Sequence, residues 1–286
     1  MDLVWLIISA VLLAVDFLIA GLYQKGEGNA PVKVFRFNFF IGLFSVIIFF
    51  FINGCQFEFT WFSGVLALVM TSLAILYTLI GFRILAAGNT AYYSFFLMTG
   101  GMTVPYVWGL FFLDEEFSWL RLAGLVLIIG SAFVIYAGKN RLSPKIMGLC
   151  AAIFLLNGFV SVISKHHAIS EQAVSASGYV ILTAMVKVLV CGAILLFFRL
   201  KKKENAGKIK PKAIILLAAS ALVSGLSYLL QLGGAASLPA TVVYPIVTGG
   251  SIVFTAVAGW LFLKEKPTKQ LIFGVLVCFV GTCLFL

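Results

Sequence analysis

The sequence predicts an all-α membrane protein whose ten transmembrane helices form an inverted 5+5 repeat. Of its 286 residues 62% are hydrophobic and only 10% are charged, whereas ordinary globular domains carry about 25% charged residues. The mean hydropathy is +1.13. The apolar segments are too long for barrel strands, and in lipid only helices or closed barrels satisfy the backbone. A helical bundle is therefore expected, and a long internal repeat indicates that it has two related halves.

Ten apolar segments are each long enough to cross a bilayer, whose core of about 30 Å needs roughly 20 helical residues. Proline suits the first turn of a helix because its missing N–H needs no partner there. Four prolines mark helix starts in this way: Pro31, Pro144, Pro211 and Pro239. The expected spans are 2–22, 32–52, 60–83, 90–113, 118–137, 144–164, 174–198, 212–232, 239–263 and 268–286.

The two halves of the chain repeat one another. A shift of 149 positions places the Thr-Gly-Gly at 99–101 on the Thr-Gly-Gly at 248–250, and Glu116 on Glu265. Because five is an odd number, the second five-helix unit starts on the opposite side of the membrane from the first. Inverted repeats of this kind are typical of secondary transporters. We expect a first repeat at 1–140 and a second, inverted repeat at 141–286.

The basic residues gather in alternate loops. Of the 20 Lys and Arg residues, 17 lie in the connections that follow the odd-numbered spans, seven of them between Arg199 and Lys212. By the positive-inside rule these loops are cytoplasmic, so both termini are predicted to lie outside a multi-pass protein of the cell (plasma or inner) membrane. Topology thus accounts for the net charge of +10, and no nucleic-acid partner is expected. The expected partners are the lipid bilayer and a small-molecule solute, with the oligomeric state left open.

Neither the cysteines nor the histidines suggest a cofactor. Four of the five cysteines fall inside expected spans, where they act as small apolar residues. His166 and His167 are adjacent, so on a helix they point about 100° apart, and we expect solvated residues rather than metal ligands. No nucleophile has a base at a plausible spacing. The sequence therefore predicts no metal, no cofactor, no catalytic residue and no enzyme activity.

Polar residues inside a bilayer are costly, so those that recur at helical spacing mark candidate contacts with a solute. Spans four and nine carry related polar stripes at matching positions of the two repeats, which predicts a central cavity near the membrane midplane. The alternative is that these Ser and Thr residues hold helices together. The candidate substrate-binding residues are Asp16, Asn157, Tyr92, Thr99, Tyr179, Thr183, Lys187, Tyr244 and Thr248.

Asp16 and Lys187 are the charged residues near the middle of expected spans. There a charge costs about 2.5–3.5 kcal/mol on insertion scales. One hypothesis makes Asp16 a proton-coupling or cation site and Lys187 an anion site. The competing hypothesis pairs the two as a buried salt bridge, which would say nothing about transport.

Each half ends with a run of small residues, a Thr-Gly-Gly, a Leu-Phe-Leu followed by an acidic turn, and a last helix with spaced glycines. The second half reads GGAASLPATVVYPIVTGGSIVFTAVAGWLFLKEKPTKQLIFGVLVCFVG. The first reads FRILAAGNTAYYSFFLMTGGMTVPYVWGLFFLDEEFSWLRLAGLVLIIG. These stretches resemble the EamA domains of the drug/metabolite transporter (DMT) superfamily. The resemblance implies an inverted bundle that exchanges a small organic solute by alternating access.

The chain departs from this resemblance in two places. Family members commonly carry their first basic cluster between spans two and three, with the termini inside, but here that loop has no Lys or Arg. The first half also has three acids at 114–116 where one is usual. Asp16 is similar in placement to the first-helix acid of the small multidrug resistance proteins, where protons and cationic drugs compete for it.

The leading hypothesis is a secondary transporter that moves a small polar or cationic organic metabolite by alternating access, with proton coupling through Asp16. The aromatic faces of Tyr92, Tyr179 and Tyr244 would suit amines. The alternative is an exchanger of an anionic metabolite, an amino-acid carboxylate or a phosphorylated solute, held by Lys187. A third hypothesis is a membrane protein that transports nothing, which the absence of a solvent-accessible central cavity would indicate.

Overall fold

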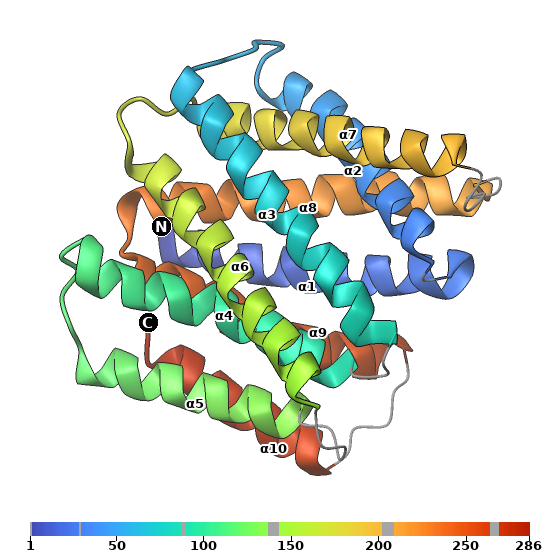
Figure 1. Ribbon diagram of the computed structural model, residues 1–286. Helices are drawn as coiled ribbons and strands as arrows, with labels where there is room; N and C mark the ends of the chain where they lie inside the picture. The colour runs from blue at the N-terminus through green and yellow to red at the C-terminus, as the bar shows by residue number, and fades with distance from the viewer. Residues whose placement is uncertain (1, 29, 87–89, 137–142, 202–208, 264–268) are drawn as a thin grey trace.

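The computed structural model describes residues 2–28, 30–86, 90–136, 143–201, 209–263 and 269–286. In this part of the chain every regular element is an α-helix, and the helices pack into one bundle (Figure 1). They are α1 (Asp2–Glu27), α2 (Pro31–Ile52), α3 (Trp61–Ala86), α4 (Thr90–Phe112), α5 (Trp119–Tyr136), α6 (Pro144–Ile169), α7 (Ala176–Leu200), α8 (Pro211–Ser237), α9 (Ala240–Leu263) and α10 (Lys269–Cys283).

The helices lie where the apolar segments predict them, and the differences are confined to helix ends. Pro31, Pro144 and Pro211 are the first residues of α2, α6 and α8, as expected. The helices α1, α6 and α8 each run five residues beyond their predicted ends. Hydropathy excludes these polar last turns, but a helix continues through them because its backbone groups stay paired.

Eight of the described helices are long and apolar enough to cross a membrane. The remaining two, α5 and α10, are shorter apolar helices. The 15 residues of α10 span roughly 22 Å at 1.5 Å per residue, less than the bilayer core of about 30 Å. The two short helices pack against each other at one side of the bundle (Figure 1).

Successive helices run between two ends of the bundle. We call one the termini end, because both chain termini lie there (Figure 1) together with the α2–α3, α4–α5, α6–α7 and α8–α9 connections. Hydrogen bonds join these connections: the Glu58 carboxylate accepts from the backbone N–H of Ser175 at 2.7 Å and from its hydroxyl at 2.8 Å. These bonds hold the pKa of Glu58 below its ordinary value.

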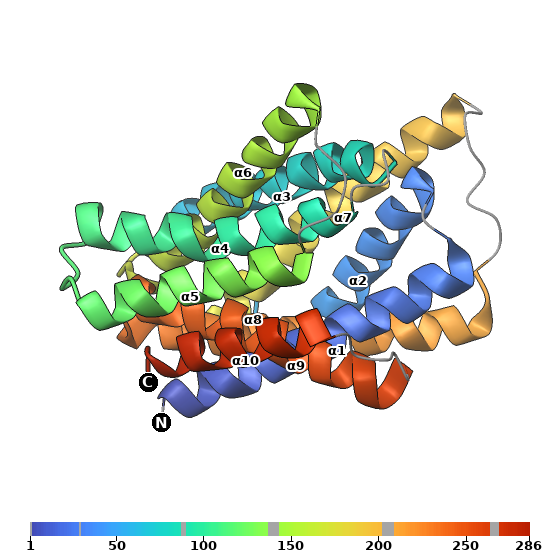
Figure 2. The same cartoon turned by 90° about the horizontal axis from the view of Figure 1, so that it is seen from below.

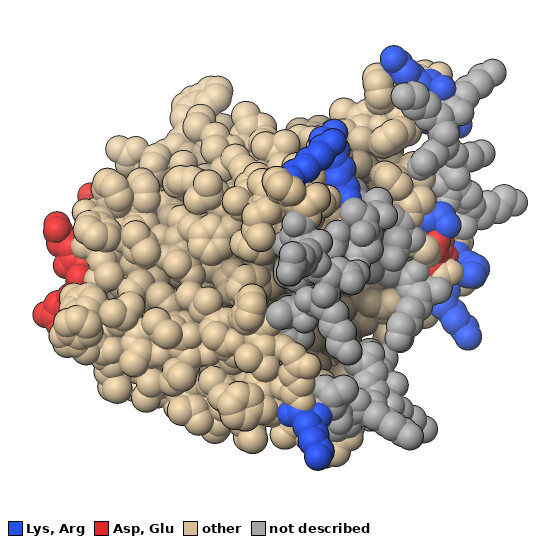
Figure 3. Space-filling model, turned by 60° about the horizontal axis from the view of Figure 1, so that its bottom comes forward, with Lys and Arg blue, Asp and Glu red and all other residues tan. Residues whose placement is uncertain are grey.

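The opposite end carries most of the described Lys and Arg residues, and we call it the basic end. Figure 3 shows blue side chains gathered at one end of the molecule and most of the red ones at the other. The described sequence follows the same division, since Glu58 and Asp114 lie in connections at the termini end while Lys33 and Lys210 lie at the basic end. The structure thus has the charge asymmetry on which the predicted orientation depends.

Six helices form the middle of the bundle. The helix α1 packs against α8 and α9, while α6 packs against α3 and α4, and α4 contacts α9 between them (Figures 1 and 2). The helices α2 and α7 pack against each other, as do α5 and α10. The centre of the bundle is therefore lined by α1, α3, α4, α6, α8 and α9.

Glycines allow α4 and α6 to approach closely. A Cβ added to Gly100 would lie 2.2 Å from the carbonyl oxygen of Phe154 in α6, and one added to Gly158 would lie 2.3 Å from the side chain of Val104. Contact at this distance between membrane helices depends on small residues. The Thr-Gly-Gly of the first repeat thus has a packing role at Gly100.

Gly100→Ala is expected to destabilise the protein, because overpacking costs about 1–3 kcal/mol and the contacted atom belongs to the backbone. The matched control is Gly148→Ala in α6, where an added Cβ meets nothing within 4 Å and alanine favours the helix by about 1 kcal/mol. The thermal unfolding midpoint of purified protein should fall for Gly100→Ala and not for Gly148→Ala. Equal midpoints for the two variants would contradict the close approach of α4 and α6.

Candidate solute site

A cavity of about 280 Å³ lies between α1, α3, α4, α6, α8 and α9. Leu13 and Gly101, which line it, lie at the centres of α1 and α4, so the cavity sits near the middle of the bundle. No Asp, Glu, Lys or Arg belongs to its described lining. Its polar groups come mainly from three helices: Asn157, Ser161 and Ser164 of α6, Tyr228 and Gln231 of α8, and Tyr244, Thr248 and Ser251 of α9.

Hydrogen bonds between helices hold part of this lining in place. Asn157 donates its side-chain N–H to the carbonyl oxygen of Leu97 in α4 at 2.7 Å. The Tyr244 hydroxyl donates to the carbonyl oxygen of Ser161 at 2.6 Å. Ser164 and Tyr228 are joined through their hydroxyls at 2.9 Å. These bonds fix α6 against α4, α8 and α9 around the cavity.

Two other polar groups of the lining have no hydrogen-bond partner among the residues that the structure describes. Within the described part of the chain, neither the Gln231 amide nor the Thr248 hydroxyl makes a hydrogen bond. Buried polar groups are normally paired, so these groups are available to a solute or to water. Phe17 and Met98 add apolar surface beside them. The cavity can thus hold a small molecule by hydrogen bonds and apolar contact.

Three of the predicted site residues line this cavity: Asn157, Tyr244 and Thr248. Thr99 and Thr183 are buried and donate their hydroxyls to carbonyl oxygens of their own helices, at 2.7 and 3.0 Å. That arrangement is the helix-packing role that the sequence left open as an alternative.

Two predicted tyrosines do not belong to the described lining of the cavity. Tyr179 is buried and stacks on His167 with ring centroids 3.5 Å apart. Tyr92 lies in the first turn of α4, and its side chain falls outside the described residues.

Asp16 and Lys187 lie close enough to interact electrostatically, but no direct ion pair joins these two described residues. The Asp16 carboxylate instead accepts a hydrogen bond from the Ser220 hydroxyl of α8. Asp16 is not part of the cavity lining, although its neighbour Phe17 is. Arg36, a buried cation of α2, forms an ion pair with Glu27 at 2.6 Å.

Lys187 lines a second cavity of about 80 Å³ between α2, α3 and α7. Asn38, Thr71 and Thr78 supply polar groups to its wall. Tyr77 lines both this cavity and the central one. Tyr77 is therefore a wall residue common to the two cavities.

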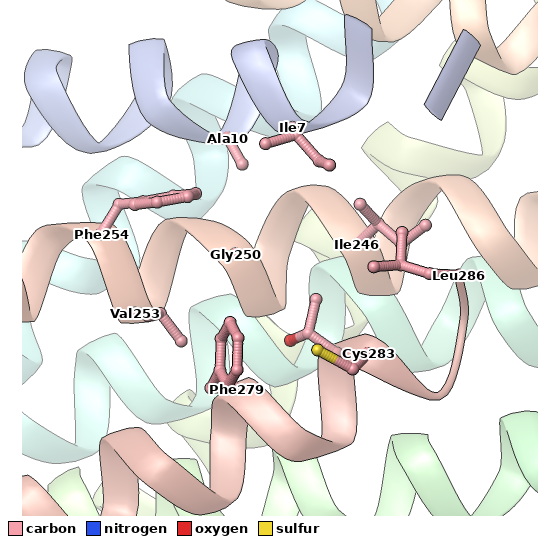
Figure 4. A pocket seen from close by; sticks show the side chains of 10 residues that line it. Ile7, Ala10, Ile246, Gly250, Val253, Phe254, Phe279, Cys283 and Leu286 are labelled. Carbon is pink, nitrogen blue, oxygen red and sulfur yellow. The ribbon is translucent and has the colours of Figure 1, made fainter. Parts of the chain in front are cut away.

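A third cavity, of about 130 Å³, lies between α1, α9 and α10 and is lined mostly by apolar side chains (Figure 4). Ile7, Ile246, Val253 and Phe279 point into it. It offers a polar solute very little, because its described lining holds no charged group and no amide. The central cavity, at about 280 Å³, is larger than the cavity at Lys187 and has a wall rich in hydroxyl and amide groups, so its chemistry suits a polar solute.

The model of the EamA-like transporter family matches residues 144–286, which is half of the chain. The chain belongs to the EamA-like transporter family. This family is part of the DMT superfamily, so the protein is a membrane transporter of that type. Among solved structures 28 chains match. One, described as "Crystal structure of protein", aligns over 98% of this chain and 94% of its own with a TM-score of 0.76. At 14% identity this likeness shows the fold alone. A search of curated proteins found no match.

Sequence reasoning missed Tyr228 and Gln231 of this EamA-like transporter. Their first-repeat counterparts under the shift of 149 are Leu79 and Phe82, so a search for polar residues repeated in both halves passes over them. The available signal was their spacing, since Tyr228 and Gln231 lie three apart on one face of a helix. Where the two halves contribute different residues to a cavity, a comparison of the halves does not reveal those residues.

The prediction that His166 and His167 are solvated loop residues was wrong. Both belong to α6, and His167 is 2% exposed, with its ring nitrogen 3.0 Å from the Ser63 hydroxyl. His166 accepts a hydrogen bond from the indole N–H of Trp108 at 3.0 Å. The last polar turn of α6 packs inside the bundle, where these partners replace water. No group of three or more His, Cys, Asp and Glu residues suited to a metal ion occurs in the described ranges.

Proposed function

We propose that this EamA-like transporter carries a small polar organic metabolite, neutral or cationic, by alternating access through the central cavity. The observation that supports this most directly is the uncharged polar lining near the middle of the bundle, with the Gln231 amide and the Thr248 hydroxyl unpaired among the described residues. A solute would complete their hydrogen bonds. The aromatic faces of Tyr77, Tyr228 and Tyr244 suit a cation as well.

Many transporters that work by alternating access are built from two related halves, and we propose that the halves of this chain are inverted repeats. The exchange of α1 with α6, α3 with α8 and α4 with α9 turns the observed packing of α1 on α8 and α9 into the observed packing of α6 on α3 and α4. The pairs α2–α7, α5–α10 and α4–α9 map onto themselves. An internal two-fold relation would produce such a pattern. We further propose that the basic end is cytoplasmic and the termini end external, by the positive-inside rule.

Gln231→Leu is expected to weaken solute binding about tenfold, because a hydrogen bond to the cavity wall is lost. A thermal-shift screen of purified protein against amines, amino acids and sugar phosphates would first identify ligands. A ligand at a hundredfold excess over its Kd stabilises the protein by about 2.7 kcal/mol. The control is Gln270→Leu, whose amide bonds to Val134 at the basic end, away from the cavity.

The proposal fails if no compound in the panel stabilises the protein. It fails also if a stabilising compound binds Gln231→Leu and the parent protein equally well, since the ligand would then occupy another place.

A second candidate function is exchange of an anionic metabolite such as an amino acid with a free carboxylate. The specific observation in its favour is the cavity at Lys187, whose ammonium has no ion-pair partner among the described residues. The shared wall at Tyr77 would let a solute in the central cavity extend its carboxylate toward Lys187. In the first candidate function Asp16 instead carries a proton that is exchanged during transport.

Paired variants separate the two candidates. In the first, Asp16→Asn is expected to abolish the dependence of uptake on an imposed pH gradient in proteoliposomes, while Lys187→Met retains it. In the second, Lys187→Met is expected to bind an amino acid no better than its primary amide, while the parent protein prefers the acid at least tenfold. If uptake by the Asp16→Asn variant still depends on the pH gradient, Asp16 has no part in the mechanism. If the Lys187→Met variant still prefers the amino acid to its primary amide, Lys187 is not the anion site.

A further inference from the structure

A buried lysine forms hydrogen bonds to the turn between α8 and α9 at the termini end. Lys165 of α6 is only 6% exposed, and its ammonium donates hydrogen bonds to the carbonyl oxygens of Ala235 and Leu238, both at 2.7 Å. The last carbonyls of a helix have no partner within the helix. They also carry the negative end of the helix dipole, which a cation stabilises. Lys165 therefore binds the end of α8 as a charged cap supplied by another helix.

The carboxylate of Glu115 accepts hydrogen bonds from the other side of the same turn. The Glu115 carboxylate, in the α4–α5 connection, accepts from the backbone N–H groups of Ala240 at 2.5 Å and Thr241 at 2.8 Å. These are the first N–H groups of α9, at the positive end of its dipole. Hydrogen bonds to an ionised group are about twice as strong as neutral ones. Glu115 is thus a charged cap for α9 that comes from the opposite half of the chain.

The chain around Glu115 is shaped to place this carboxylate. Gly109 leaves the space it occupies, since a Cβ there would lie 2.5 Å from a carboxylate oxygen of Glu115. The preceding residue, Asp114, has a φ of 51°, a left-handed conformation that Asp tolerates better than most residues. The backbone N–H of Glu115 donates to the carbonyl oxygen of Gly109 at 3.1 Å. Glu115 therefore folds back over the end of α4.

The two caps reinforce one another. Lys165 and Glu115 are near enough to attract each other electrostatically, although no direct ion pair joins these described residues. Each one holds one side of the Leu238–Pro239 turn. The pair fastens α8 and α9 of the second half to α6 and to the α4–α5 connection.

This fastening lies between the central cavity and the termini end. Ser164 lines the cavity and is followed directly by Lys165, and Tyr244 lines it one turn after Ala240. Lys165, Tyr244 and Thr241 are all buried, with exposed fractions of 6%, 1% and 0%. These three residues therefore present almost no surface to solvent between the cavity and the termini end.

We propose that Lys165 and Glu115 form a charge lock that keeps the solute cavity closed at the termini end, and that its release opens the cavity there. The inference rests on the proposed alternating access. To open this end, the α8–α9 turn must move away from α6 and the α4–α5 connection, which breaks four charge-assisted hydrogen bonds. Lys165 and Glu115 would then set how often the transporter visits the state that is open at this end.

The test measures access to the cavity from the termini end. The parent protein carries Gln231→Cys in the cavity and lacks the exposed Cys283, while the exposed Cys55 of the α2–α3 connection is kept to report sidedness. A membrane-impermeant maleimide is added to vesicles in which Cys55 reacts from outside. We expect Lys165→Met and Glu115→Gln each to raise the labelling rate at position 231 about tenfold over the parent. Gly109→Ala should act in the same direction, since it displaces Glu115.

The matched control is Glu116→Gln, which removes an exposed acid next to Glu115 and should leave the rate unchanged. Access from the basic end is measured in vesicles of the opposite orientation. If position 231 reacts from either end, labelling from the termini end that is equally fast in the parent, Lys165→Met and Glu115→Gln overturns the lock. So does rapid labelling of the parent from the termini end. If Lys165→Met fails to fold, Glu115→Gln decides, because glutamine has nearly the same shape but lacks the charge and keeps only one of the two acceptor oxygens that bind Ala240 and Thr241. A position 231 that is unreachable from both sides in every variant overturns the proposed alternating access instead.

Discussion

Polar groups taken into a bilayer must find partners inside the protein, since no water is there to bond them, and the interior of this transporter is arranged around that requirement. Ser9 of α1 and Ser227 of α8 exchange hydrogen bonds with each other's carbonyl oxygens at 2.8 Å. Ser220 serves the Asp16 carboxylate in the same pair of helices. These bonds, with the close contact of α4 and α6 at Gly100, hold four of the six helices that surround one central space.

In that space two polar groups of the wall lack hydrogen-bond partners among the described residues. The unpaired amide of Gln231 and hydroxyl of Thr248 face a cavity that the described side chains do not fill, so a solute gains hydrogen bonds there that the protein lacks. At the termini end, in contrast, Lys165 caps the last turn of α8 and Glu115 caps the first turn of α9. A transporter that binds a solute while closed on one side needs polar groups at its centre that can bond the solute and helix ends that are held together at the closed side.

The helices were predictable because twenty or so apolar residues leave the chain little choice in lipid, and prolines such as Pro144 mark their starts. Partners across the bundle were not predictable. The repeat pairs Glu116 with Glu265, yet the residue that caps α9 is Glu115, because the left-handed turn at Asp114 decides which acid faces inward. Hydropathy likewise ended the sixth span at residue 164 and left His167 solvated, whereas Lys165 and His167 are both buried against partners distant in sequence. The helical spacing of polar residues in the ninth span was enough to predict Thr248 as a site residue, and Thr248 lines the cavity.

The claim on which the proposed function depends is that a wet cavity lies at the centre of the bundle. Spin labels on α9 test it directly, with one at Thr248 in the cavity and one at Val257, which is 39% exposed on the outer surface. In liposomes, the collision rate of each label with a water-soluble nickel complex and with oxygen is measured. The cavity requires the label at 248 to meet the nickel complex and the label at 257 to meet oxygen. A label at 248 that meets neither reagent, or only oxygen, would show a dry centre and contradict a solute site there.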